Sequence, residues 1–193
     1  MTAQAHVPPE MPGRPGPDIP LPPRGAEDDR PALPTTGGER EILTAFLDWH
    51  RATFELKCRG VSPARLSDRA IPPSGLSLHG LVRHLAAAER RWIRIHFAGE
   101  DLPLLNSSDE DPDQDFEQLG GDVETAFAVW RAERDRARII VAEAPSLDAT
   151  CRSPLTGQEM SLRYLLIHLI AEYARHNGHA DLLRERIDGT TGL

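Results

Sequence analysis

The sequence predicts an all-α fold, a four-helix bundle with a long crossover between its second and third helices. Apolar residues recur at spacings of three and four positions, as on one face of a helix, in four separate segments. The connection between the second and third segments, residues 99–121, is long and acidic, as expected of a chain that crosses one end of a bundle. The four helical segments are expected at 39–58, 77–98, 122–143 and 161–187.

The first two helices are bounded by residues that cap or end a helix. The first is expected to end at Cys58 because Gly60 follows, and its apolar stripe consists of Ile42, Phe46, Trp49 and Leu56. The second begins after Ser77, whose hydroxyl can cap a helix N-terminus, and it ends before Gly99. Its expected apolar stripe consists of Leu78, Leu81, Leu85, Ala88, Trp92 and Ile95.

The second half of the bundle follows the same pattern. The third helix is expected to end before Pro145, which cannot continue a helix. Residues 150–160 are expected to form a short hairpin with Gly157 at its tip. Ser161 can then cap the fourth helix.

The first 38 residues differ in composition from the rest of the chain. They contain most of the prolines and few clustered apolar residues. We expect residues 1–38 to form a disordered, proline-rich tail and residues 39–193 to form one bundle domain.

The overall composition excludes several classes of function. A formal net charge of −8 argues against a protein that binds nucleic acid by neutralising phosphates. No stretch approaches the roughly 20 apolar residues that a membrane span needs, and the N-terminus does not have the pattern of a secretory signal. The two cysteines, Cys58 and Cys151, are too few for a disulfide framework, so we expect a cytoplasmic protein.

The fourth expected helix contains an unusual row of ionisable groups. His168, Glu172, His176 and His179 fall within about 80° of one another on a helical wheel, among leucines of the same helix. Burying such groups without partners is costly, so they must be hydrogen-bonded, neutralised or bound to a metal ion. A carboxylate and imidazoles at this spacing are suitable ligands for a divalent cation such as zinc.

A metal site needs a third ligand from another element, and His84 on the second expected helix is the best candidate. The alternative for Glu172 and His176 is a structural ion pair between adjacent turns, and for His84 a hydrogen-bonded position at the edge of the core. His168 and His179 could each be a further ligand, but positions beside the metal or in the pocket suit them better. Arg175 could contact an anionic substrate, and His50 could line the same pocket.

Other catalytic patterns are absent from the sequence. It contains neither HExxH, nor a phosphate-binding glycine motif, nor a GxSxG elbow. The acidic connection, including Asp109 to Asp115, lacks the ligand spacing of a calcium loop, so we interpret it as a solvated run of charge. Cys58 ends a helix and is interpreted as structural.

Two segments carry a resemblance to a known family. PPSGLSLHGLVRHLAAAERRW, residues 72–92, and HLIAEYARHNGHADLLRERIDGTTG, residues 168–192, resemble the DinB-like (YfiT-like) superfamily of metalloenzymes. The chain looks most similar to an uncharacterised actinobacterial branch related to the mycothiol-dependent maleylpyruvate isomerases. The resemblance implies a four-helix bundle holding one divalent metal with His84, Glu172 and His176 as ligands. The Glu and His pair on the last helix is the form seen in mycothiol-dependent members.

The resemblance also implies a reaction class. It predicts an S-transferase or isomerase in which the metal activates mycothiol, a low-molecular-weight thiol, toward a small electrophile. Zinc is the expected metal, although nickel, iron and manganese accept the same ligands. Two alternatives remain open: a metal-dependent hydrolase, and a non-catalytic stress or partner-binding bundle with a structural polar cluster. A homodimer also remains open, because apolar stripes on the first and third helices would allow one.

Overall fold

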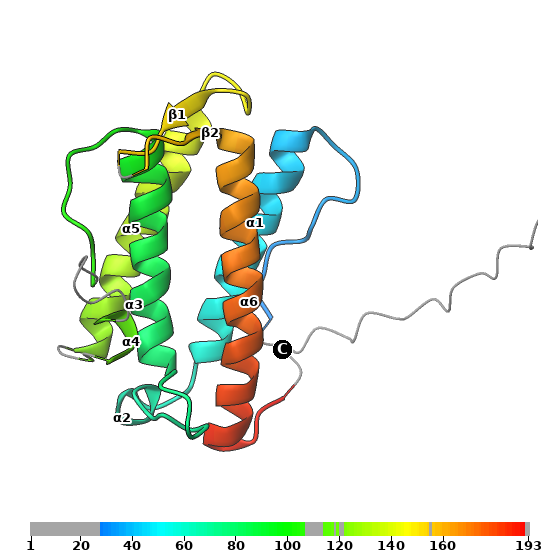
Figure 1. Cartoon of the computed structure of the whole chain (residues 1–193). Coiled ribbons are helices and arrows are strands. Elements are labelled where there is room, and N and C mark those ends of the chain that lie inside the picture. The colour runs from blue at the N-terminus through cyan, green and yellow to red at the C-terminus, as the bar shows by residue number, and fades with distance from the viewer. Residues whose placement is uncertain (1–27, 107–113, 118, 120–121, 155, 192–193) are drawn as a thin grey trace, which may run out of the picture.

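The computed structural model describes residues 28–106, 114–117, 119, 122–154 and 156–191. Four main helices form a bundle, as predicted, with a small hairpin at one end (Figure 1). The elements are α1 (Glu39–Cys58), α2 (Pro63–Leu66), α3 (Leu78–Glu89), a π-helix η1 (Arg90–Phe97), α4 (Gln114–Glu117), α5 (Val123–Glu143), β1 (Thr150–Arg152), β2 (Glu159–Ser161) and α6 (Leu162–Asp188).

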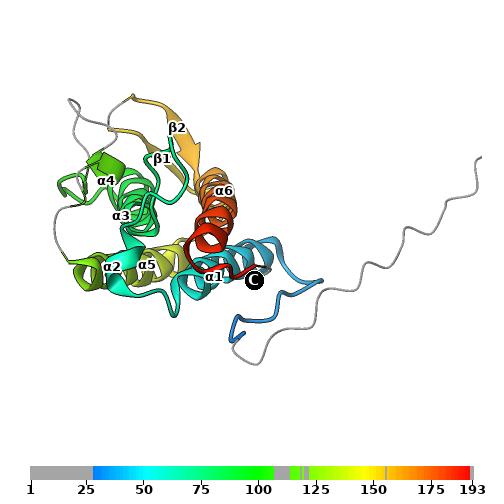
Figure 2. The same cartoon turned by 90° about the horizontal axis from the view of Figure 1, so that it is seen from below.

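The helices are arranged as two packed pairs. Helix α1 packs along α6, α3 packs along α5, and α3 also contacts α6 (Figure 2). The antiparallel hairpin pairs Cys151 with Met160 and lies over the end of the bundle where η1 finishes and α6 begins. Among the residues that the structure describes, every helix is too short or too polar to serve as a membrane span.

The predicted caps account for the helix ends. The hydroxyl of Ser77 accepts a hydrogen bond from the backbone N–H of Gly80 at 3.0 Å, and the hydroxyl of Ser161 accepts one from Tyr164 at 3.2 Å. Gly189 ends α6 in the left-handed conformation, with φ at 78°, which glycine adopts without a steric penalty.

The second predicted helix differs from expectation in its second half. The chain winds as a π-helix from Arg90 to Phe97 instead of continuing as an α-helix. Because a π-helix turns less per residue, the side chains after Glu89 point in other directions than a regular period predicts. Ile93 and His96 are therefore buried, whereas Trp92 and Ile95 are only partly buried.

The predicted tail is described only from residue 28 onward, and residues 1–27 lie outside the described part. Residues 28–38 form neither helix nor strand but lie against α1. The guanidinium of Arg30 sits 4.8 Å from the ring centroid of Trp49 and donates to the hydroxyl of Thr53. Helix α1 begins at Glu39, where the first helix was expected to begin.

One buried polar network contacts all four main helices. The carboxylate of Glu89 on α3 is 0 % exposed and accepts two hydrogen bonds from Arg51 on α1, at 2.7 and 2.6 Å. It also accepts one from the hydroxyl of Tyr173 on α6 at 2.8 Å, and that hydroxyl accepts one from the indole N–H of Trp130 on α5. Burial, and then the charge of Glu89, raise the pKa of Tyr173 well above its ordinary value, so its phenol remains a donor.

We predict that Tyr173→Phe lowers the free energy of unfolding by about 1–3 kcal/mol, measured by urea denaturation. The substitution removes the acceptor of Trp130 and one donor of Glu89 without removing apolar volume. Tyr164→Phe is the matched control, because Tyr164 is 47 % exposed and should change stability by less than about 0.5 kcal/mol. Equal effects of the two substitutions would contradict the role given to the network.

Candidate metal centre

Three side chains predicted as ligands meet between α3 and α6. His84 projects from α3, and Glu172 and His176 project from successive turns of α6. One donor atom from each residue lies within 4.8 Å of the other two. All three side chains are at least partly buried, and His84 is the most exposed of them at 27 %.

The distances within the cluster fit metal ligands better than hydrogen bonds. Oε2 of Glu172 lies 3.4 Å from Nε2 of His176 and 3.7 Å from Nε2 of His84. Both separations exceed the usual N–H···O range of 2.7–3.2 Å. Two ligands at about 2.1 Å from a tetrahedral zinc ion lie about 3.4 Å apart, so the observed spacing can accommodate an ion.

The outer nitrogens of both histidines have partners that orient the rings. Nδ1 of His84 lies 3.1 Å from Oδ2 of Asp115 on α4, and Nδ1 of His176 lies 3.3 Å from Nδ1 of His179. When Nδ1 carries the proton, Nε2 presents a lone pair toward the centre of the cluster. A partner on the outer nitrogen of a ligating histidine is a recurrent feature of metal sites.

The protonation state of His176 also suits a metal ligand. Burial is the main cause that lowers the pKa of His176 to about 4, and the neighbouring His84 lowers it further. The imidazole of His176 is therefore neutral near pH 7, as a metal ligand must be.

Asp115 corrects one prediction from the sequence. The acidic connection was interpreted as a solvated run of charge, yet Asp115 is only 4 % exposed and contacts His84. The remaining acidic residues at 109–113 lie outside the described part. Helix α4 can reach α3 because Gly80 has no side chain: a Cβ there would lie 3.1 Å from the ring of Phe116. Phe116 in turn stacks on His84 at 5.1 Å between ring centroids.

Of the other predicted pocket residues, three lie beside the cluster and one does not. His168 approaches Glu172 at 3.9 Å, and the guanidinium of Arg175, which is 60 % exposed, lies 3.3 Å from Oε1 of the same carboxylate. His179 contacts His176, as described above. His50 lies instead at the contact of α1 with α6, where Asn177 hydrogen-bonds to it, so the structure does not bring it into the cluster.

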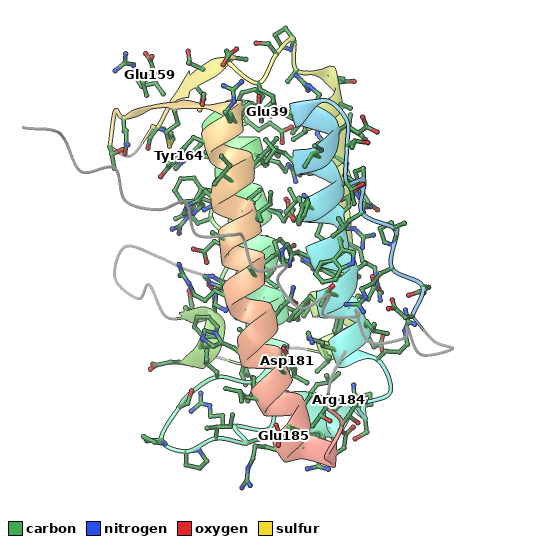
Figure 3. All side chains as sticks on the ribbon, turned by 90° about the vertical axis from the view of Figure 1, so that its right-hand side faces the viewer. Glu39, Glu159, Tyr164, Asp181, Arg184 and Glu185 are labelled. Atoms are coloured by element: carbon green, nitrogen blue, oxygen red, sulfur yellow. The ribbon has the colours of Figure 1, made fainter. Side chains whose placement is uncertain are left out.

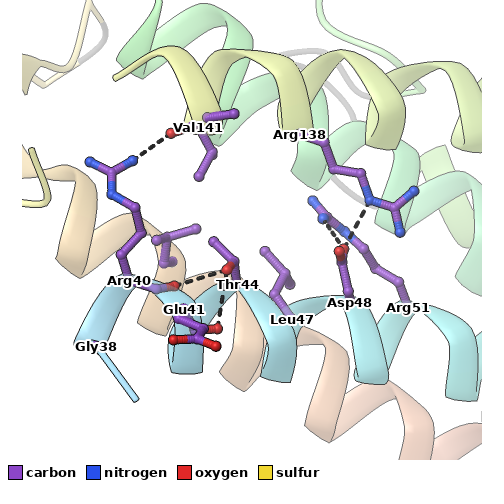
Figure 4. Close-up of a pocket in the computed structure, with 11 residues that line it drawn as sticks. Gly38, Arg40, Glu41, Thr44, Leu47, Asp48, Arg51, Arg138 and Val141 are labelled. Atoms are coloured by element: carbon purple, nitrogen blue, oxygen red, sulfur yellow. Dashed lines mark hydrogen bonds and ion pairs between the residues drawn. The ribbon is translucent and has the colours of Figure 1, made fainter. Parts of the chain in front are cut away.

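A separate cavity of about 660 Å³ lies between α1 and α5 (Figure 4). Its wall is mostly apolar and includes Leu47, Val141 and Leu166. Its arginines are already engaged: Arg40 donates to the carbonyl oxygen of Val141, and Arg51 and Arg138 both contact Asp48. Leu166 lies six positions before Glu172 and so about 120° around α6 from it. This cavity is therefore separate from the cluster of His84, Glu172 and His176, which we call the metal-type cluster.

Comparison with protein families identifies the chain. Residues 42–189 match the model of the family described as MST, mycothiol-S-transferase. The chain belongs to the mycothiol-S-transferase family. The match covers nearly the whole bundle, including the three residues of the cluster, and membership implies mycothiol as a cosubstrate. A search of curated proteins finds no significant match.

The two cysteines of this family member are poorly suited to supply the reacting sulfur. Burial is the main cause that raises the pKa of Cys58 to about 12, and burial also raises the pKa of Cys151 above its ordinary value. Both thiols therefore stay protonated near pH 7, which agrees with the structural role predicted for Cys58 and leaves mycothiol as the thiol.

We predict that Cys58 resists labelling by a disulfide reagent in the folded protein at pH 8. Cys151, which is partly exposed, should react first, and Cys58 should react only after denaturant is added. Counting released chromophore in wild type, Cys58→Ala and Cys151→Ala assigns each thiol. Rapid labelling of Cys58 in the folded Cys151→Ala variant would contradict this account.

Proposed function

We propose that this protein is a metal-dependent mycothiol S-transferase whose single divalent ion is held by His84, Glu172 and His176. The family match supports the reaction class. The observation that carries the metal site is the spacing of the three donors, which lie too far apart for hydrogen bonds and at suitable distances for a shared ion.

Zinc is the metal that we propose, because two imidazoles and one carboxylate are a common catalytic zinc ligand set and the reaction requires no change of oxidation state. Nickel, iron and manganese accept the same donors. When bound, the ion would stabilise the thiolate form of mycothiol near neutral pH, because a coordinated thiol loses its proton readily.

The residues of the chain would position the reactants. Asp115 and His179 hold the rings of His84 and His176 with their Nε2 atoms directed inward. His168 and Arg175 lie beside Glu172, and in this proposal the substrate binds on that side of the cluster. In the reaction the sulfur of mycothiol forms a bond to an electrophilic carbon, the bond from that carbon to its leaving group breaks, and the thiol proton passes to solvent.

The functional unit proposed here is the bundle, residues 39–193, with residues 1–38 as an appended tail. Two free cysteines, one of them buried, suit a reducing compartment such as the cytoplasm.

We predict that metal binding depends on the three proposed ligands. Metal-stripped wild type should take up one zinc ion in competition with a chromophoric chelator, whereas His84→Ala and His176→Ala should not compete. Asp115→Asn should bind with about 10–100-fold lower affinity, because it alters a partner of a ligand rather than a ligand. His50→Ala is the matched histidine control and should bind like wild type. Full zinc uptake by both ligand variants would rule out this site.

We predict that the zinc-loaded protein forms S-conjugates of mycothiol with small alkyl chlorides, detected by mass spectrometry above the spontaneous rate. The metal-free protein and His84→Ala should not exceed that rate. Conjugation that does not depend on metal would contradict the mechanism. Thiol-independent hydrolysis of esters or amides would favour a metal-dependent hydrolase, and no activity with no metal uptake would favour a non-catalytic bundle.

A further inference from the structure

Three aromatic side chains lie in a row beside the metal-type cluster. Trp92 on η1 lies 4.3 Å from His168 on α6, measured between ring centroids, and Tyr164 lies 6.1 Å from the same His168 with its ring nearly parallel. We call these three residues the aromatic wall. Tyr164 stands near the hairpin end of α6, on the side away from α1 (Figure 3).

The π-helix accounts for the position of Trp92. In an uninterrupted α-helix, a residue eight positions after His84 would lie about 80° around the axis from it. The wider winding of η1 reduces the turn per residue and brings Trp92 back toward the side of the helix that carries His84. Single stretches of π-helix inside α-helices occur frequently at functional sites.

Neighbouring side chains hold the wall in place. The ring of His96 packs edge-on against Trp92 at 5.0 Å and 87°, on a stretch anchored by the fully buried Ile93. An aromatic ring fixed in this way can bind a flat ligand with little loss of side-chain freedom.

The wall leads directly to the proposed reaction centre. His168 lies 3.9 Å from Oε1 of Glu172, and the other oxygen of that carboxylate faces His84 and His176. Tyr164 is 47 % exposed, so the outer end of the wall is accessible to solvent. A molecule lying on the wall would therefore present one end to the metal-type cluster.

We propose that the aromatic wall is the binding site for the electrophile, and that the preferred electrophiles carry a flat aromatic ring, as benzylic halides do. This inference rests on the proposed function, which requires a second substrate beside mycothiol. The aromatic faces of the wall suit a stacked ring, whereas the sugar hydroxyls of mycothiol would need more polar partners. For a benzylic chloride, the sulfur–carbon bond forms, the carbon–chlorine bond breaks, chloride leaves with the electron pair and the thiol proton passes to solvent.

The test compares two electrophiles that lose the same leaving group, 4-nitrobenzyl chloride with a ring and chloroacetamide without one. Trp92→Leu should raise the KM of the zinc-loaded protein for 4-nitrobenzyl chloride about tenfold and leave the KM for chloroacetamide unchanged. Trp92→Phe, which keeps an aromatic ring, should have a KM for 4-nitrobenzyl chloride close to that of wild type. If Trp92→Leu does not fold, Tyr164→Ala replaces it, because Tyr164 is exposed. That variant should raise the KM for 4-nitrobenzyl chloride by a smaller factor. Trp49→Leu on α1 is the matched tryptophan control and should behave as wild type.

A second measurement does not depend on activity. Calorimetry of metal-free protein with unreactive 4-nitrobenzyl alcohol should show about tenfold weaker binding by Trp92→Leu than by wild type. Three kinetic results would overturn the proposal. They are equal KM values of wild type and Trp92→Leu for 4-nitrobenzyl chloride, an equal rise in the KM of Trp92→Leu for both electrophiles, and a rise only in its KM for mycothiol. If wild type conjugates neither electrophile, the proposed function fails, and the calorimetry with 4-nitrobenzyl alcohol alone tests the aromatic wall. Weaker binding by Trp92→Leu than by wild type would support the wall as a binding site for a flat ring. Equal binding by the two proteins would overturn it.

Discussion

The buried carboxylate of Glu89 is the interaction on which the rest of this structure depends. It accepts hydrogen bonds from Arg51 on α1 and Tyr173 on α6, and through Tyr173 it reaches Trp130 on α5. A buried charge left without its partner typically costs 3–5 kcal/mol, so the four helices can rotate or slide little without breaking the network. The network therefore defines the relative orientation of the helices more strictly than apolar packing alone would.

The same network controls the geometry of the metal-type cluster. Tyr173 directly follows Glu172, and Glu89 lies five residues after His84 on the same helix. Holding these two residues together aligns α3 and α6 so that Glu172 and His176 face His84. The long crossover between α3 and α5 contributes Asp115, which contacts Nδ1 of His84. The crossover therefore helps to position one of the proposed ligands.

Much of this architecture could be predicted from the sequence, because it depends on local patterns. Helical periodicity, the caps at Ser77 and Ser161 and the spacing of Glu172 and His176 are all properties of short segments. The burial of Asp115 could not be predicted, because it depends on α4 docking where Gly80 leaves room, a contact between distant parts of the chain. Its one local signal was an acidic residue followed by Phe116 in a polar stretch.

The π-helix was missed for a different physical reason. A sequence pattern is interpreted with a constant turn of about 100° per residue, and η1 departs from that value. Trp92, which was expected on the apolar stripe of the helix, consequently lies beside the proposed site, and His96 is buried instead.

A crystal structure of the zinc-loaded protein, with anomalous data at the zinc edge, tests the central claim most directly. The account predicts one anomalous peak between α3 and α6, about 2.0–2.2 Å from Nε2 of His84, Nε2 of His176 and a carboxylate oxygen of Glu172. A peak bound by other residues, or these three side chains without zinc at saturating metal, would contradict it.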